Sequence, residues 1–183
     1  IDSLSIKDVI NLKEVCSVID VGTGAGFPGI PLKIAFPHLK VTLLDSLNKR
    51  VKFLNEVIFE LGLKNIETVH GRAEDVARNK EYREQYDICV SRAVANLTTL
   101  CEYCLPYVKV GGILISYKSG NVEEEIKDSE KAVSILGGIV KKVIKFELRG
   151  TNIGRSFVII EKKKSTPKKY PRKAGLPSKE PLK

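Results

Sequence analysis

The sequence predicts an α/β fold with a seven-stranded, mostly parallel sheet, and two observations carry this prediction. Short β-branched runs alternate along the chain with longer amphipathic segments, as they do where helices cover a parallel sheet. The first apolar run leads into a glycine-rich turn at residues 18–31, V-I-D-V-G-T-G-A-G-F-P-G-I-P. A strand, a tight turn and a helix in this order form a cradle for nucleotide-type ligands, because the helix N-terminus presents free N–H groups.

The elements follow in order from this pattern. Apolar, β-branched runs predict strands at 15–21, 40–45, 65–70, 86–91, 113–117, 139–148 and 155–161. Helical periodicity, ended each time by proline or glycine, predicts helices at 29–36, 46–61, 97–105 and 122–136. Glycines at 111–112 should turn the chain into the fifth strand. Residues 150–154 should join the last two strands as a hairpin, which gives the sheet one antiparallel edge strand.

The glycine turn is the first candidate site. Gly24, Gly26 and Gly29 satisfy the dinucleotide pattern G-x-G-x-x-G, which is weak by itself. Asp20, two residues before Gly22, would repel a pyrophosphate but would suit a cationic amino-acid group. The pattern D-x-G-x-G-x-G therefore favours S-adenosylmethionine over NAD. The alternative is a glycine turn that serves only close packing of strand and helix.

An acid also ends the second predicted strand, and two acids lie in the loop after the third. Asp45 could accept both ribose hydroxyls of a bound nucleoside, or could cap the helix that follows. Glu74 and Asp75 are candidates to accept from an adenine amino group, and each could instead be an N-cap or a surface acid. Arg92, at the end of the fourth strand, contacts substrate or cofactor, or forms a surface ion pair.

Charge divides the chain into one domain and a tail. The segment 162–183 holds nine of the 31 basic residues and one of the 22 acidic ones, so most of the net charge of +9 lies there. We expect a single domain at 1–161 that has lost upstream sequence, and a basic C-terminal tail at 162–183 that packs on it or extends from it. The tail suggests a polyanion partner, with nucleic acid the leading candidate. A solubilising disordered tail is the alternative.

The rest of the composition indicates a cytoplasmic globular enzyme. No apolar run reaches the roughly 18 residues of a membrane helix, so no membrane partner is expected. Four cysteines do not make a disulfide framework at this length, and Cys16 and Cys89 are expected to be core thiols. The C-x-x-C spacing of Cys101 and Cys104 has no second pair, so we expect no metal site.

Two motifs of other methyltransferase classes are absent, and this limits which atom could accept the methyl group. The fourth strand is followed by Ser-Arg-Ala-Val in place of the N-P-P-[YF]-like turn of amino-directed enzymes, and no proline-preceded cysteine offers a nucleophile for pyrimidine carbon. Nitrogen 7 of guanine already has an unshared pair and loses no proton, so it needs positioning alone. The sequence is consistent with that acceptor, and no catalytic residue is assigned.

Five motifs resemble one family. They are D-V-G-T-G-A-G-F-P-G-I-P (20–31), L-L-D-S-L-N-K-R-V-K-F-L (43–54), G-R-A-E-D (71–75), S-R-A-V-A (91–95) and Y-P-R-K-A-G-L-P (170–177). Together they resemble the RsmG family, also called glucose-inhibited division protein B, the bacterial 16S ribosomal RNA guanine-7 methyltransferases. Members typically begin with a further helical segment. Residues 117–120, Tyr-Lys-Ser-Gly, depart from the pattern, since many relatives run lysine straight into glycine.

The resemblance implies a class I S-adenosylmethionine-dependent methyltransferase with a Rossmann-like fold. It implies methylation of a guanine in the 530 loop of 16S RNA, free or in the small ribosomal subunit, with S-adenosylhomocysteine as product. The cofactor residues carried over are Gly22, Gly24, Phe27, Asp45, Ala73, Glu74 and Arg92, beside Asp20. Arg92 and Lys118 are positioning candidates, and the RNA-binding candidates are Lys118, Arg155, Arg172 and Lys173. We expect a monomer that does not bind DNA.

Two other functions stay open on the sequence. A nucleotide-dependent oxidoreductase can use the same kind of sheet and glycine turn. A non-catalytic RNA-binding module could keep such a pocket without using it. Ligand binding distinguishes the oxidoreductase from a methyltransferase. Methyl transfer to RNA distinguishes a methyltransferase from the non-catalytic RNA-binding module.

Overall fold

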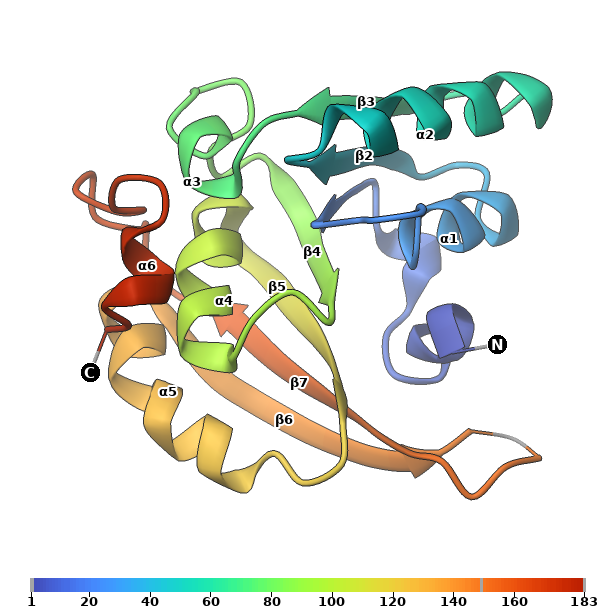
Figure 1. The fold of residues 1–183 in the computed structure, drawn as a ribbon. Helices are drawn as coiled ribbons and strands as arrows, with labels where there is room; N and C mark the ends of the chain where they lie inside the picture. The colour runs from blue at the N-terminus through green and yellow to red at the C-terminus, as the bar shows by residue number, and fades with distance from the viewer. Residues whose placement is uncertain (1, 149, 183) are drawn as a thin grey trace.

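The computed structural model describes residues 2–148 and 150–182 as one seven-stranded sheet with helices on both faces (Figure 1). The strand order is β3-β2-β1-β4-β5-β7-β6. The strands are β1 (Ser17–Val21), β2 (Lys40–Asp45), β3 (Ile66–His70), β4 (Tyr86–Arg92), β5 (Val108–Ser119), β6 (Gly138–Glu147) and β7 (Gly154–Lys162). β1 to β5 pair in parallel, and β7 pairs antiparallel with both β5 and β6.

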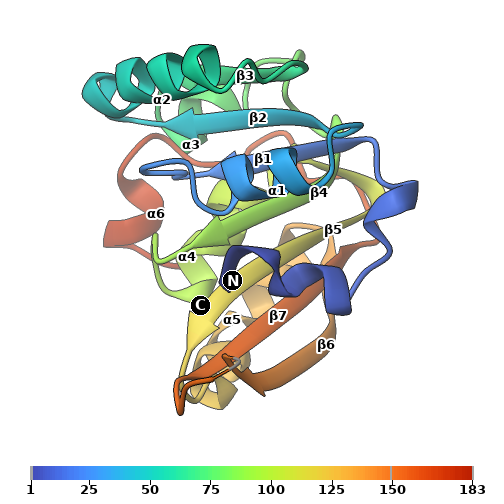
Figure 2. The ribbon, with the colours of Figure 1, turned by 90° about the vertical axis from the view of Figure 1, so that its right-hand side faces the viewer.

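Two hydrophobic cores fill the two faces of the sheet. The first 3-10 helices, η1 (Asp2–Asp8) and η2 (Leu12–Glu14), lie with α1 (Gly29–Ala35) and α2 (Asn48–Glu60) on one face (Figure 2). The other face is covered by α3 (Ala73–Val76), α4 (Leu97–Cys104), the 3-10 helix η3 (Leu105–Tyr107) and α5 (Glu123–Ile135). Val18 and Ile19, neighbours in β1, belong to opposite cores and are both fully buried. β1 is therefore an uninterrupted apolar strand, as expected of a central parallel strand.

The predicted α/β fold is confirmed, with the differences at the ends of elements. The strand that runs against the others is β7, which lies one place in from the edge because β6 pairs on its far side. β5 begins at Val108, so Gly111 and Gly112 lie inside a strand where a turn was predicted. Gly111 has φ +88°, and the register with β4 shifts between Tyr86 and Ile88. This bulge keeps the strand in the sheet while its backbone bends.

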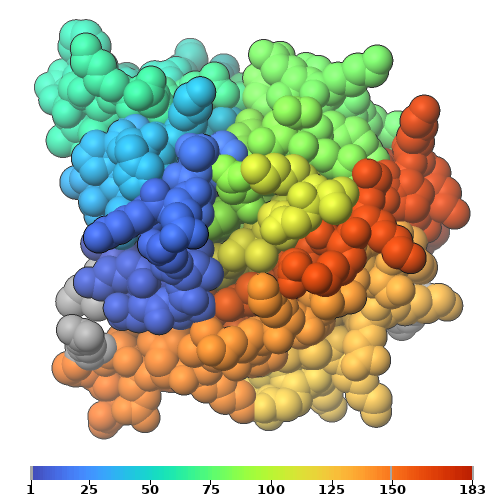
Figure 3. All heavy atoms as spheres, turned by 180° about the vertical axis from the view of Figure 1, so that it is seen from behind, coloured from blue at the N-terminus to red at the C-terminus, as the bar shows by residue number. Residues whose placement is uncertain are grey.

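The segment after β7 folds back onto the domain. The Lys162 ammonium is fully buried at its start, donating to Leu105 O at 2.6 Å and Thr166 Oγ1 at 2.6 Å and pairing with Glu84. Burial lowers the pKa of Lys162 to about 8. Seen from behind, the start of this segment runs across the surface of the molecule (Figure 3). Further along, α6 (Leu176–Lys179) packs against α4. The end points of the two predicted units, Ile1 and Lys183, lie outside the described residues.

Three smaller predictions can be compared with the structure. Cys16 is exposed, which corrects its prediction as a core thiol, because β1 begins one residue later; Cys89 is buried as predicted. Cys101 and Cys104 are buried free thiols on α4, and no group of three potential metal ligands occurs among the described residues. In the described part of the chain, no helix is both long and apolar enough to cross a membrane.

Candidate functional site

The candidate site lies at the carboxyl ends of β1, β2 and β4. β1 pairs with β2 on one side and with β4 on the other, so the crossover direction of the chain reverses between β1 and β4. Ligands of open α/β sheets bind in the crevice at such a point. The structure brings Asp20, Asp45 and Arg92 to this edge, each at the end of its strand.

Asp20 is a fully buried carboxylate with one free oxygen. Its Oδ2 accepts from Thr23 Oγ1 at 2.7 Å and from the N–H of Gly29 at 2.8 Å. Its Oδ1 has no hydrogen-bond partner among the described residues. Burial raises the pKa of Asp20 to about 6, although these two hydrogen bonds and the Arg92 guanidinium act against the rise. An incompletely compensated buried acid suits a positively charged ligand group.

The glycine turn brings backbone close to this acid. A Cβ at Gly29 would collide with the side chain of Leu43 and stand 3.0 Å from Asp20 Oδ2, so a side chain there would displace the carboxylate. Gly24 has φ +63°, and a Cβ there would meet nothing within 4 Å, which leaves the backbone open toward a ligand. Above Gly22 the same space is taken by the side chain of Val94.

Asp45 links the turn to the start of α2. Its Oδ2 accepts from the Gly24 N–H at 2.9 Å and from Arg50 at 3.3 Å, and its Oδ1 accepts from the Leu47 N–H at 2.9 Å. The N-cap position of α2 falls on Leu47, so Asp45 stands before the helix and orients its first turn. A carboxylate offers about four acceptor positions, so Oδ1 retains one for a ligand.

A pocket of about 190 Å³ opens beside Asp45 and joins several of the predicted residues. Gly22, Asp45, Ala73 and Glu74 line it, whereas Asp75 is exposed and lies outside it. Glu74 is 5% exposed, and the Tyr107 hydroxyl donates to Ala73 O at 2.7 Å and fixes the start of α3. Of the two acids considered for adenine, Glu74 is the one in the pocket.

Among the pocket residues that sequence reasoning did not assign to the site, Tyr103, Gly175 and Ser178 come from distant parts of the chain. Tyr103 comes from α4, and the other two come from the segment after β7. Gly175 belongs to the 170–177 motif, which the sequence analysis used for the family resemblance and for RNA contacts, and Ser178 directly follows that motif. The sequence signal for a turn at this point is the glycine at position 175. In the structure Gly175 has φ +84° and is the N-cap of α6.

A second pocket, of about 510 Å³, lies on the other side of the loop that follows β4 and gathers three cations. Arg92 pairs with Asp2 at 3.2 Å, Lys118 pairs with Glu125 at 2.7 Å, and the Arg155 guanidinium lies 3.6 Å from Asp2. Arg92 therefore forms an ion pair, which was one of its two interpretations, while its contact with substrate or cofactor stays a prediction.

Phe27 and the tail candidates complete the set of predicted residues. Phe27 is partly exposed, and the Arg92 guanidinium lies 5.5 Å from the centre of its ring. Arg172 and Lys173 do not line the second pocket. Arg172 forms an ion pair with Glu102 at 2.7 Å, and Lys173 is exposed.

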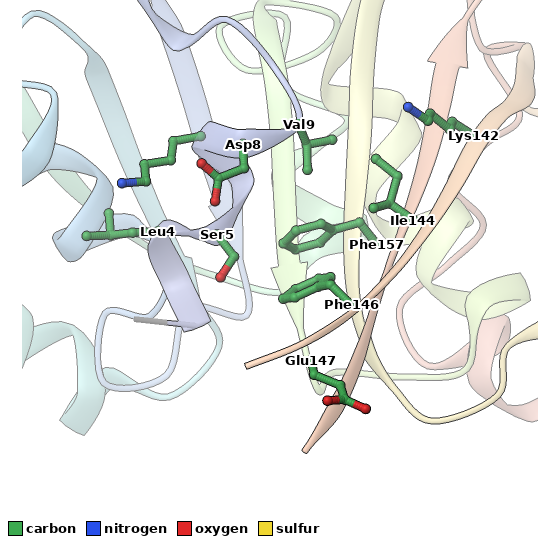
Figure 4. Close-up of a pocket in the computed structure, with 10 residues that line it drawn as sticks. Leu4, Ser5, Asp8, Val9, Lys142, Ile144, Phe146, Glu147 and Phe157 are labelled. Carbon is green, nitrogen blue, oxygen red and sulfur yellow. The ribbon is translucent and has the colours of Figure 1, made fainter. Parts of the chain in front are cut away.

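A larger hollow of about 570 Å³ lies elsewhere, between η1 and the β6–β7 hairpin (Figure 4). Phe146 and Phe157 form its apolar floor, with Leu4 and Val9 opposite and charged side chains at its rim. It contains none of the predicted site residues, so size alone does not identify the site of chemistry.

Comparison with known proteins shows which family the chain belongs to. The sequence profile of the GidB family, described as rRNA small subunit methyltransferase G, matches residues 1–153. The chain belongs to the GidB family. One GidB relative, "Ribosomal RNA small subunit methyltransferase G" of Acetivibrio thermocellus, is 58% identical over 182 residues, covering 100% of this chain and 74% of the relative.

Solved structures of other proteins share the fold of this chain. "StiE O-MT residues 961-1257" matches with a TM-score of 0.68 at 15% identity, over 89% of this chain and 73% of that one. The apo S-adenosylmethionine-dependent methyltransferase SibL matches with a TM-score of 0.64 at 17% identity, over 84% of this chain and 52% of that one. The architecture is thus the Rossmann-like fold of class I S-adenosylmethionine-dependent methyltransferases, as the sequence predicted.

Proposed function

We propose that this chain transfers a methyl group from S-adenosylmethionine to nitrogen 7 of a guanine in the 530 loop of 16S ribosomal RNA. The observation that carries the cofactor assignment is Asp20, a buried carboxylate whose Oδ1 lacks a partner among the described residues. The acceptor class is supported by the relatives, which are named as methyltransferases of small-subunit ribosomal RNA. Because RNA is the substrate, we propose that the protein acts in the cytoplasm, as a monomer, on free 16S RNA or the small ribosomal subunit.

The chemistry of the residues near the ends of β1, β2 and β3 suits the parts of S-adenosylmethionine. Asp20 Oδ1 would accept from the ammonium of the methionine part, beside the open backbone of Gly24. Asp45 would accept from ribose, and Glu74 from the adenine amino group, beside Ala73. Gly22 and Phe27 would line the region of the methionine and the ribose. When bound, this cofactor supplies a methyl group activated by its sulfonium.

The chain's own contribution to the reaction is positioning. Nitrogen 7 of guanine carries an unshared pair and loses no proton when it is methylated, so no side chain has to act as a base there. Phe27 presents an exposed ring face beside the turn, on which a base could stack, and the Arg92 guanidinium lies close to that ring. Holding donor and acceptor in line accounts for most of what such a site must do.

RNA contacts are assigned to the second pocket and to the tail. Arg92, Lys118 and Arg155 bring three positive charges to one hollow, and phosphate oxygens are the partners that such side chains bind best. In the structure these cations pair with Asp2 and Glu125, which an RNA phosphate would have to displace. On the tail the exposed Lys173 is a further candidate, whereas Arg172 is already paired with Glu102.

Two measurements test the proposal. Calorimetry should show binding of S-adenosylhomocysteine and none of NAD; binding of NAD alone would make the chain an oxidoreductase. Incubation of radiolabelled S-adenosylmethionine with small ribosomal subunits that lack the mark should label 16S RNA, and cleavage at 7-methylguanine should place the label in the 530 loop. No incorporation would leave an RNA-binding module, and incorporation elsewhere would overturn the acceptor assignment.

A further inference from the structure

The segment that follows β7 is attached to the domain along most of its length. Arg83 donates to Thr166 O at 2.8 Å and to Tyr170 O at 2.9 Å, and Arg78 donates to Pro171 O at 2.7 Å. Each of these bonds uses an arginine side chain of the domain and a backbone carbonyl of the segment. The backbone path is therefore fixed before the chain reaches the pocket.

The strongest attachment joins Arg172 to Glu102. The Glu102 carboxylate is 1% exposed, and it accepts from the Arg172 backbone N–H at 2.7 Å, from Nε at 3.0 and 3.1 Å, and from Nη2 at 2.7 Å. This contact raises the pKa of Arg172. A forked pair with a buried carboxylate holds both position and orientation. The edge of the Arg172 guanidinium that carries Nε and Nη2 is therefore already held by Glu102.

Three residues further on, the segment forms one side of the cofactor pocket. The Gly175 N–H donates to Glu74 Oε1 at 2.8 Å, and Gly175 and Ser178 both line the pocket. Glu102 is adjacent in sequence to Tyr103, which lines the same pocket from α4. The segment therefore engages Oε1, one of the two oxygens of this pocket-lining acid.

We propose that residues 165–182 are a fixed wall of the cofactor pocket, and that Glu102 and Arg172 are positioning residues that set affinity for the nucleoside end of S-adenosylmethionine. This inference rests on the proposed function. It divides the basic tail into two parts. Arg172 anchors the wall, whereas exposed lysines such as Lys168 stay free for a polyanion.

The experiment compares R172A, E102Q and the double variant with the wild type, using K168A as a control. K168A removes the same charge from the same segment at an exposed residue. We expect R172A and E102Q each to weaken S-adenosylhomocysteine binding about tenfold in calorimetry, well below the unfolding temperature. The double variant should be no weaker than the worse single variant, because both break one contact. K168A should bind S-adenosylhomocysteine like the wild type.

Kinetics separate positioning from mere stability. In R172A the KM for S-adenosylmethionine should rise while the KM for ribosomal subunits stays at the wild-type value, and R172K, which keeps the charge without the fork, should recover part of the loss. If R172A does not fold, R172K and E102Q carry the test. Wild-type cofactor affinity in these variants, even with a lower melting temperature, overturns the inference, and so does a rise confined to the KM for RNA. A wild type that does not bind S-adenosylhomocysteine refutes the proposed function itself.

Discussion

Asp20 gives the sharpest test of how the site would hold its ligand. The pKa of this buried acid is about 6, so at pH 5 about nine in ten molecules carry it protonated. Only the ionised form can attract an ammonium group. The apparent Kd for S-adenosylhomocysteine should therefore rise about tenfold between pH 8 and pH 5, with most of the change below about pH 6. Asp20→Asn should bind weakly and with nearly constant affinity across the same range.

Calorimetry of both proteins from pH 5 to pH 8 checks this, with proton release measured near pH 6 in buffers of different ionisation enthalpy. The ligand-free protein supplies an independent check. Because the folded-state pKa of Asp20 lies above its value in the unfolded chain, the free energy of unfolding should fall as pH rises from about 4 to about 6, by at most about 3 kcal/mol. A wild-type affinity that does not change with pH, or a slope that survives in Asp20→Asn, would refute the reasoning.

Three further predictions follow from other contacts. Asp45→Ala should weaken S-adenosylhomocysteine binding by about 1–3 kcal/mol in calorimetry, because Gly24 loses its acceptor and ribose its charged partner; unchanged affinity would remove Asp45 from the site. Gly29→Ala should lower stability in urea unfolding by about 1–3 kcal/mol and also cofactor affinity, since the new methyl group meets Leu43 and Asp20. The control Gly24→Ala has open space and should cost only about 1 kcal/mol in backbone strain, so equal losses would contradict the packing argument. Lys118→Ala should weaken RNA binding and reduce the salt slope by about 1, whereas an unchanged slope would show that Lys118 touches no phosphate.

The sheet and the acidic end of the site follow from local sequence patterns. Buried parallel strands need continuous apolar runs, and the turn after β1 needs glycine where Gly29 meets Leu43 and Asp20. An apolar run and a glycine-rich turn each occupy a short stretch of the chain, so both are visible in the sequence. The positions of Asp20 and Asp45 at neighbouring strand ends follow from them directly.

The missed parts depend on contacts between distant residues or on very short elements. α3 and α6 have four residues each, too few for a periodic pattern. Gly111 and Gly112 look like a turn in sequence, yet Val108 and Ile113 on either side of them pair with β4, and a bulge keeps the glycines in the strand. Arg172 looked like an RNA contact because a charge count cannot reveal that Glu102 lies buried beneath it. Tyr103 of α4 lines the pocket together with Gly175 and Ser178, which lie more than 70 residues away in the chain, so no local pattern reveals the combination.

The Gly175 amide joins residues 101 positions apart in the chain, through its bond to Glu74. Contacts of such long sequence separation form late, since a large loop must close first. The side of the pocket near Glu74 should accordingly be among the last features to assemble during folding. The rate at which the Gly175 amide hydrogen exchanges with deuterium would then report whether this side of the pocket is formed.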